Sequence, residues 1–415
     1  MTLNNPGQNL LPSLRVWWGS TQTRCERAMV SLLIAVSLVT IFSTALVQTL
    51  VVCLMIVVTS CTLFEYRGSW RRTPLDIPFF AFIAGRVLSI AFSQYPWRSI
   101  SALRIEFLFY GVFFLATQAV RQEEEDASRV VMVGIVAAGV IGAIIGILKV
   151  VLEIEKRASS TTAGTYTLGA YLALVLPLAV FFSLESNRNL LKHWSWAVPL
   201  LFSIGILLTF DRLHWAAMGS ILFVAALLSR KRMPFIVTAV ALLALLTIPS
   251  VWGRFMQIFD LGENMNGRDV LWRGAAMIFT EHPITGFGPR SFPYIFPLFE
   301  QIPVRGVGSW HNDFLQVYME SGLLGLGPLL WLIVATYYHS VRWIRSGLGS
   351  PYRRGLVLTL LASVSVMFVI GGILDTIVGI TFRILLAFLA LLIARSDLPE
   401  SPAGTGSPLP LSNVT

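Results

Sequence analysis

The chain has 415 residues, of which 55% are hydrophobic and only 13% are charged, and it carries a net charge of +9 with a mean hydropathy of +0.72. This composition is typical of a polytopic helical membrane protein and not of a soluble domain. The apolar runs are long and continuous, which excludes the two-residue alternation of a β-barrel and favours helices that satisfy their own backbone hydrogen bonds.

The first apolar run extends from Ala28 to Phe64 without a charged residue, which is about twice the length of one membrane crossing. We therefore predict two helices joined by a tight turn near Gln48. Residues 1–27 lack a short apolar stretch with a small-residue cleavage site, so we expect no cleavable signal peptide. Neither a disulfide framework nor a metal site is indicated by the three cysteines, which are Cys25, Cys53 and Cys61.

Taking about 20 residues for each crossing, we predict about twelve transmembrane helices. Their approximate positions are 28–45, 47–64, 76–94, 99–120, 129–151, 166–184, 194–210, 213–229, 233–251, 318–338, 355–375 and 379–395. The loops on one side carry most of the Lys and Arg residues, including the pairs Arg71-Arg72 and Arg353-Arg354. The positive-inside rule then places both termini in the cytoplasm. The positive charge is therefore a topology signal, and it does not indicate a nucleic-acid partner.

The longest segment outside the predicted spans, about 252–317, falls on the opposite, outer side. Within it, the apolar residues of 268–280 recur near helical spacing, which predicts a short interfacial helix. The following "HPITGFGPRSFPYIFP" is rich in Gly and Pro and predicts a shaped loop. The predicted organisation is a cytoplasmic N-terminus (1–27), helices 1–9 (28–251), a periplasmic catalytic loop with short helices (252–317), helices 10–12 (318–395) and a disordered cytoplasmic tail (396–415).

The stretch "GSWHNDFLQVYMESG", residues 308–322, gathers hydrogen-bonding side chains where this loop meets the next span. We predict a helix from His311 onward, with Asn312, Gln316 and Glu320 spaced i, i+4 and i+8 on one face. In a first helical turn the helix dipole would keep His311 neutral, which is the form that a general base needs. The alternative is that His311 is a capping or interfacial residue.

Three arginines on the outer side are candidates for binding an anion. Arg212, in the short turn "TFDRLHW", would be a rigid donor suited to a phosphate or pyrophosphate, unless it snorkels and pairs with Asp211. Arg268 opens the predicted interfacial helix, where it could reach an anionic headgroup while Trp272 suits the membrane interface; alternatively Arg268 is merely solvated. Arg290 in "GFGPRSF" is a weaker candidate of the same kind.

Charged residues inside the predicted spans are costly and should face the bundle interior. They are Arg86, Arg104, Glu106, Asp375 and Arg383. Arg86 lies mid-span and has the best claim to line a cavity, with structural ion pairs as the alternative for all five. The sequence contains no Asp-x-Asp pair for a nucleotide sugar, no Walker loop and no HExxH. An enzyme of this kind is therefore expected to use arginines where others use Mg²⁺, and to need no cofactor.

Four stretches resemble the O-antigen ligase family of bacterial envelope proteins, whose superfamily also contains O-antigen polymerases and oligosaccharide-to-protein transferases. One of them is the span "AGTYTLGAYLALVLPLAV". "HNDFLQVYMESGLLGLG" resembles the family pattern His-Asn-x-x-Leu-x-x-x-x-Glu-x-Gly-x-x-Gly. "RDVLWRGAAMIFTEHPITGFGPRSF" resembles its Arg-x-x-x-Trp…His-Pro-x-x-Gly-x-Gly segment. "TFDRLHW" resembles its Thr-x-Ser-Arg-Gly-x-Trp turn, with Asp211 in place of Ser and Leu213 in place of Gly. The resemblance covers roughly residues 160–345.

The resemblance implies that His311 is the catalytic base and that Arg212 and Arg268 bind the diphosphate of the donor. The donor would be a polysaccharide linked to undecaprenyl diphosphate, and the acceptor a sugar of lipid A–core, on the periplasmic face of the bacterial inner membrane. The remaining substrate-binding or supporting candidates are Arg86, Trp272, Arg290, Asn312, Gln316 and Glu320.

Two alternatives remain open at this level. The nearest is a polymerase that uses the same lipid-linked donor, or a transferase onto protein, because the motifs are shared within the superfamily. The second is a secondary transporter, for which twelve spans are typical and a midplane Arg86 would suit a substrate site. Transporters usually contain internal repeats with broken helices in both halves, and no such repeat is found in this sequence.

Overall fold

The computed structural model describes residues 24–120, 124–161, 164–185, 196–229, 249–256, 268–301, 308–347, 349–374 and 377–394, with isolated residues between 236 and 247. These residues form helices and turns, with no strand among them, which confirms the predicted all-α class. Within this part of the chain, six helices are long and apolar enough to cross a membrane. The total of twelve spans stays a prediction. The predicted ninth span lies largely outside the described residues, and the C-terminal tail lies entirely outside them.

The N-terminal hairpin consists of α2 (Arg24–Val39) and α3 (Thr44–Phe64). The predicted turn near Gln48 is wrong, because the turn lies at residues 40–43 and Gln48 is inside α3. Ser43 is the N-cap of α3, and its Oγ accepts a hydrogen bond from the Leu46 N–H at 3.3 Å. A hydroxyl cap satisfies an orphan N–H at the helix start, and hydropathy alone does not reveal it.

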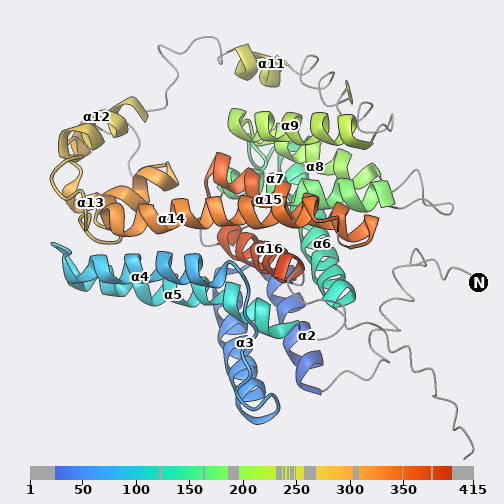
Figure 1. The fold of residues 1–415 in the computed structure, drawn as a ribbon. Helices are drawn as coiled ribbons and strands as arrows, with labels where there is room; N and C mark the ends of the chain where they lie inside the picture. The colour runs from blue at the N-terminus through green and yellow to red at the C-terminus, as the bar shows by residue number, and fades with distance from the viewer. Residues whose placement is uncertain are drawn as a thin grey trace, which may run out of the picture.

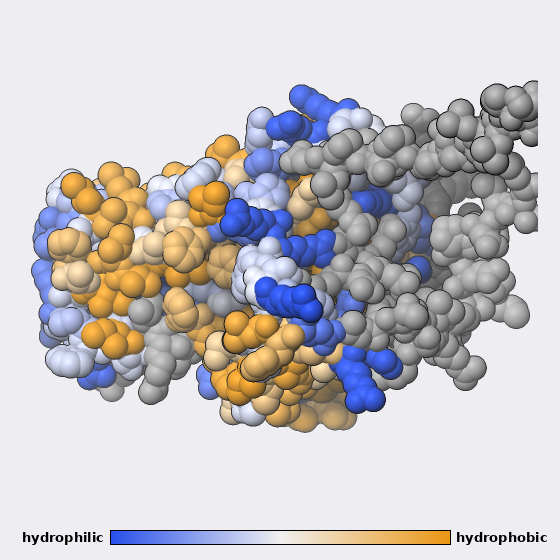
Figure 2. Space-filling model, turned by 60° about the horizontal axis from the view of Figure 1, so that its bottom comes forward, coloured by the Kyte–Doolittle hydropathy of each residue, from blue (hydrophilic) through white to orange (hydrophobic). Residues whose placement is uncertain are grey.

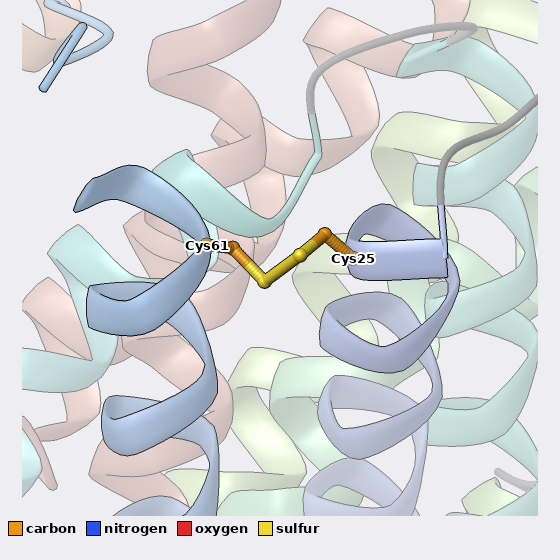
Figure 3. The surroundings of a disulfide bond; sticks show 2 residues. All are labelled: Cys25 and Cys61. Carbon is orange, nitrogen blue, oxygen red and sulfur yellow. A yellow bond between two sulfur atoms is a disulfide. The ribbon is translucent and has the colours of Figure 1, made fainter. Parts of the chain in front are cut away.

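A disulfide joins the two helices of this hairpin. Because α2 and α3 are antiparallel, Cys25 near the start of one lies beside Cys61 near the end of the other, with Cα atoms 5.8 Å apart (Figure 3). Cys53 is a free thiol. The expectation of no disulfide is therefore wrong. The pairing depends on where the chain turns back, and cysteine spacing does not encode that.

The bundle core surrounds α7 (Gly164–Glu185), which is buried along almost its whole length. Its neighbours are α6 (Glu124–Val151), α8 (Ala197–Leu208), α9 (Arg212–Ser229), α15 (Pro351–Ile370) and α16 (Ile377–Ala394). The continuous apolar sequence of α7 therefore forms a helix in the interior of the bundle.

The longest described helix, α14 (Asp313–Arg345), runs alongside α4 (Asp76–Ala91), which in turn contacts α5 (Pro96–Ala119) (Figure 1). These three helices carry the ion-paired residues Arg86, Glu106 and Glu320. The approach of α14 to α4 is close. A Cβ on Gly85 would lie 1.8 Å from the Leu324 carbonyl oxygen, so only glycine fits there. Small residues commonly allow such backbone approach between membrane helices.

The segment before α14 contains α11 (Pro249–Met256), α12 (Arg268–Ile278), α13 (Phe292–Ile295) and the short 3₁₀ helix Phe299–Gln301. In Figure 1, α12 and α13 lie together at one end of the molecule, beside α14. Trp310 is fully buried there, edge-on to Phe292 and Phe296 at ring-centroid distances of 4.8 and 5.6 Å. This segment therefore has a hydrophobic core of its own, made by Val270, Leu271, Ala275, Ile278, Phe287, Phe292, Phe296, Trp310, Tyr318 and Met319.

Much of the outer surface of the bundle is apolar. Figure 2 shows broad hydrophobic areas on one face, interrupted by hydrophilic residues. Large apolar side chains are strongly exposed, among them Phe64 (84%) and Trp97 (82%). Exposed apolar area of this extent is costly in water and suits contact with lipid.

Candidate active site

A kink in α14 organises the candidate site. Gly322 has φ 54° and ψ −150°, a conformation that interrupts the helix and is readily available only to glycine. The interruption releases the carbonyls of Met319 and Glu320 from the helical ladder. They accept hydrogen bonds from the N–H groups of Phe287 and Gly288, each at 2.9 Å.

The same loop also satisfies the backbone on the far side of the kink. The N–H of Leu323 donates to the Pro283 carbonyl at 2.9 Å, and the N–H of Leu324 donates to the Ile284 carbonyl at 3.0 Å. Residues 283–288 are therefore fastened to α14 by four backbone hydrogen bonds. A helix that is interrupted inside the protein needs such pairing, because a buried backbone N–H or C=O group without a hydrogen bond costs free energy.

The glycines of "GFGPR" explain how the loop comes so close. A Cβ on Gly286 would lie 2.4 Å from the carbonyl carbon of Glu320, and one on Gly288 would lie 2.0 Å from Ser93 Oγ. Ser93 donates to the Phe287 carbonyl at 3.1 Å, and Ser99 donates to the Pro289 carbonyl at 3.0 Å. The loop is thus wedged between α14 and the turn that joins α4 to α5.

Directly behind the kink lies a buried ion cluster. Arg86 is fully buried and donates from Nη1 to Glu320 Oε2 at 2.7 Å and from Nη2 to Glu106 Oε2 at 2.8 Å. Its Nη1 also donates to Ser321 Oγ at 3.2 Å. Arg86 therefore forms the structural ion pairs of the alternative interpretation, and its guanidinium has no exposed surface.

The cluster continues toward the surface through Glu106. The Tyr110 hydroxyl donates to Glu106 Oε2 at 3.2 Å, and Arg290 Nε lies 3.8 Å from the other carboxylate oxygen. Arg290 has φ 57° and a side chain that is 54% exposed. Arg383 meets the same group from α16, with its guanidinium 4.8 Å from the centre of the Tyr110 ring.

His311 lies just outside α14. The helix begins at Asp313, and Asn312 is its N-cap, with extended backbone and a side chain that accepts from the Leu315 N–H at 3.0 Å. The predicted helix is therefore observed, but its predicted start at His311 is wrong by two residues, because the capping geometry of Asn312 requires non-helical backbone. His311 has φ 50° and is exposed ahead of the helix start.

The predicted polar stripe on α14 is present in part. Gln316 Nε2 donates to Glu320 Oε1 at 3.1 Å, as i, i+4 spacing predicts. Asn312 precedes the helix, and its side-chain oxygen accepts the capping hydrogen bond from the Leu315 N–H. Glu320 connects the stripe to Arg86, so its carboxylate is directed toward the buried cluster.

Sequence reasoning missed Asp313. Its Oδ2 accepts hydrogen bonds from the N–H groups of Gly372 and Ile373, both at 2.7 Å. These groups belong to the connection between α15 and α16, where Gly371 and Gly372 both have positive φ. The Gly371-Gly372 pair was a visible turn signal, but nothing local could connect it to an aspartate about sixty residues earlier.

Arg212 is the first residue of α9, directly after a turn in which Phe210 has φ 56°. Asp211, the partner considered for Arg212, accepts from the Leu213 N–H at 3.0 Å and lies 3.4 Å from Nδ1 of the fully buried His214. Asp211 thus stabilises the start of α9, so the departure from the family pattern at this position has a structural use.

A chain of contacts joins this turn to the start of α14. The rings of His214 and Tyr166 have centroids 5.1 Å apart, and the Tyr166 hydroxyl donates to the Ile370 carbonyl at 3.1 Å. A Cβ on Gly371 would lie 3.5 Å from that hydroxyl and 3.7 Å from Asp313 Oδ2. The α8–α9 turn and the residues beside His311 therefore lie at the same end of the bundle.

The short helix predicted at 268–280 is observed as α12, and its position at the membrane interface stays a prediction. Arg268 is its first residue, but its side chain lies outside the described part of the structure, as do Asp375 and the side chain of Arg104. Asp269 and Arg273 form an exposed ion pair at 3.2 Å. Trp272 is half exposed, as expected for a residue at a membrane interface.

This end of the bundle can supply two chemical functions. An exposed imidazole beside a fixed helix start can accept a proton from a hydroxyl, and a guanidinium at the start of α9 can bind an anion in the field of the helix N-terminus. The loop clamped across the α14 kink brings a further guanidinium, that of Arg290, to the surface.

Comparison with known proteins supports the same class of chemistry. No curated protein matches the chain. Residues 197–332 match the family model described as O-antigen ligase, a segment that contains Arg212, Arg268, Arg290 and His311. This match implies a glycosyltransferase-type enzyme of lipopolysaccharide biosynthesis in a bacterial membrane. It confirms the resemblance inferred from the motifs, in that residues 197–332 of the chain are similar to the O-antigen ligase family.

Proposed function

We propose that the protein is an O-antigen ligase that transfers a polysaccharide from undecaprenyl diphosphate to a sugar hydroxyl of lipid A–core at the periplasmic face of the inner membrane. The observation that carries this proposal is the chain of contacts from His214 through Tyr166 to Asp313, because it supports a common site for Arg212 and His311. The family match supports the activity class. The donor, the acceptor and the residue roles belong to the proposal.

The leaving group would be a lipid diphosphate, which is already activated and needs no nucleotide. Negative charge builds on the departing phosphate oxygen as its bond to the anomeric carbon breaks. Arg212 and Arg268 would stabilise that charge, with Arg290 as a third contact. Preorganised guanidinium groups at a water-poor interface are effective in this role and require no metal ion.

His311 would act as the general base. It takes the proton of the acceptor hydroxyl while that oxygen forms the new bond to the anomeric carbon. The electron pair of the old glycosyl bond leaves with undecaprenyl diphosphate. A single displacement of this kind inverts the configuration at the anomeric carbon.

The other candidates would act around these groups. Asn312 caps α14 and is proposed to hold the position of His311. Gln316 is proposed to support the base or contact the acceptor, and Glu320 to act only through Gln316, because its own carboxylate is buried against Arg86. Trp272 is proposed to hold α12 at the interface where the polyprenyl chain enters from the bilayer.

The direct test is transfer in vitro with purified full-length protein, undecaprenyl diphosphate glycan and lipid A–core. We expect glycosylated core as the product. Deletion of the gene distinguishes the nearest alternative, since loss of a ligase leaves bare core while long lipid-linked chains accumulate. If long chains fail to form at all, the ligase proposal is wrong and a polymerase using the same donor is correct.

A further inference from the structure

The starting observation is the position of Arg290. It directly follows the loop that is hydrogen-bonded to the α14 kink, and its positive φ turns the chain there. Its side chain is half exposed, yet Nε lies 3.8 Å from Glu106 Oε1. One edge of the guanidinium thus faces a carboxylate, and the Nη edge remains available to a ligand.

Glu106 is in turn held by Arg86 on its buried side. Arg86 binds Glu106 with one nitrogen and Glu320 with the other, at 2.8 and 2.7 Å, and is itself fully buried. The main chain of Glu320 accepts from Gly288, so the same residue anchors the loop that carries Arg290. The cluster therefore fixes both the backbone before Arg290 and the carboxylate beside it.

Charge within the cluster explains why Arg290 is drawn to it. Two carboxylates face one guanidinium in the Arg86 group, so these three side chains carry a formal charge of −1 when both carboxylates are ionised. Arg290 lies on the solvent side of that charge, and Arg383 reaches the group from the other side over the Tyr110 ring. The contact between Arg290 and Glu106 is long and partly solvated, so it is weak. It can orient the Arg290 side chain and still allow the guanidinium to bind a more highly charged anion such as a diphosphate.

We propose that Arg86, Glu106 and Glu320 form a positioning device that aims Arg290 at the diphosphate of a lipid-linked donor. This inference rests on the proposed function and assigns the three residues no contact with the substrate. Holding a cation in its binding orientation before the ligand arrives removes the cost of ordering it during binding. Arg86 then acts through Glu106 and does not bind substrate itself.

The test is a double-mutant cycle on the full-length protein in liposomes, with kcat and KM measured for the lipid-linked donor. We expect Arg290→Ala and Glu106→Gln each to raise the donor KM about tenfold with a smaller effect on kcat, in line with couplings between contacting residues. The double variant should be no worse than Arg290→Ala alone. Effects of the two substitutions that multiply would overturn the proposal.

The matched control is Glu155→Gln, which removes the carboxylate of the exposed Lys149–Glu155 pair (2.9 Å) and should leave the donor KM unchanged. Hydrogen exchange of the Phe287 and Gly288 amides gives a readout that needs no substrate. Arg86→Gln should accelerate it, whereas Glu106→Gln should not, and unchanged exchange in Arg86→Gln would contradict the proposed anchoring. If the wild-type protein transfers no glycan, the proposed function is wrong. The hydrogen-exchange comparison would still test whether Arg86 anchors the loop, because it needs no substrate.

Discussion

The two polar regions of this molecule differ in how their charges are matched. Around Arg86, the guanidinium and the Glu320 carboxylate are buried and Glu106 is 16% exposed, and both terminal nitrogens of Arg86 are hydrogen-bonded to these carboxylates. Around His311 and Arg212, the polar groups lie at helix starts, where they are exposed or half-buried. A buried charge without partners is prohibitively costly, so the first region must be internally satisfied, whereas the second can retain capacity for a ligand.

This difference gives opposite expectations for substitutions. Changes in the buried cluster should first reduce stability and reach activity only indirectly. Changes at the exposed end should reduce activity and leave the fold intact. The following predictions test that division, beginning with the largest expected effect.

His311→Ala should lower the rate of glycan transfer by about 10²–10⁴-fold, the usual contribution of a general base. The thermal stability of the membrane-inserted protein should not change, because the His311 side chain is exposed. Transfer kinetics and detergent-solubilised unfolding measured on the same preparation check both parts. Wild-type activity in this variant would remove His311 from the mechanism.

Arg86→Leu should destabilise the protein by about 3–5 kcal/mol, because it leaves two carboxylates buried without their cation. Thermal unfolding and yield in the membrane measure this. The triple variant with Glu106→Gln and Glu320→Gln should recover much of the lost stability. A stable, well-expressed Arg86→Leu protein would show that the cluster is not the internally balanced region described above.

Arg212→Ala should reduce kcat by about 10²–10³-fold, as expected when a preorganised donor to a developing negative charge is removed. Arg268→Ala is expected to act in the same direction. The quantity to compare is kcat at saturating donor, with membrane insertion verified for each variant. An effect on expression alone would assign Arg212 to the structural group.

Cys25→Ser should have little effect on transfer, but the pair reports on topology. The structure joins Cys25 and Cys61 in a disulfide, whereas the predicted cytoplasmic position of this end of the α2–α3 hairpin would keep both thiols reduced in the cell. We expect the cytoplasmic position to decide the redox state in intact cells. In a Cys53→Ser background, which removes the free thiol, Cys25 and Cys61 should then react with a membrane-permeant maleimide and not with an impermeant one. A disulfide found in living cells would place this end outside and reverse the predicted orientation.

Excess chelator should have the smallest effect, with transfer rates unchanged. Arginine-based stabilisation of the leaving group needs no divalent ion, in contrast to metal-assisted transfer. Rates are compared with and without chelator and after addition of Mg²⁺. Strict dependence on a metal would mean that the arginines do not carry the leaving-group charge alone.

The sequence predicted features that depend on local spacing. The helical class, the short helix α12 and the Gln316–Glu320 pair all follow from periodicity over a few residues. The ends of helices were harder to predict from the sequence, because Ser43 and Asn312 are caps whose role depends on backbone geometry. Base and arginine candidates came from motifs that fall within the matched family segment.

Contacts between distant segments could not be predicted. The partners of Arg86 come from two other helices, and Asp313 binds a turn about sixty residues away. The sequence correctly raised structural ion pairs as an alternative for Arg86, but it could not identify Glu320 as a partner. The Cys25–Cys61 disulfide was missed for the same reason, since the antiparallel register of α2 and α3 decides it.

The kink at Gly322 limits how the site can open. Lifting residues 283–288 away from α14 would break four backbone hydrogen bonds at once and expose Gly286, Phe287 and Gly288, which are buried. This loop is therefore a fixed wall and cannot serve as a lid. If the proposed function holds, substrates would have to arrive and depart along this wall, with the lipid-linked donor exchanging laterally with the bilayer and the acceptor diffusing in from outside.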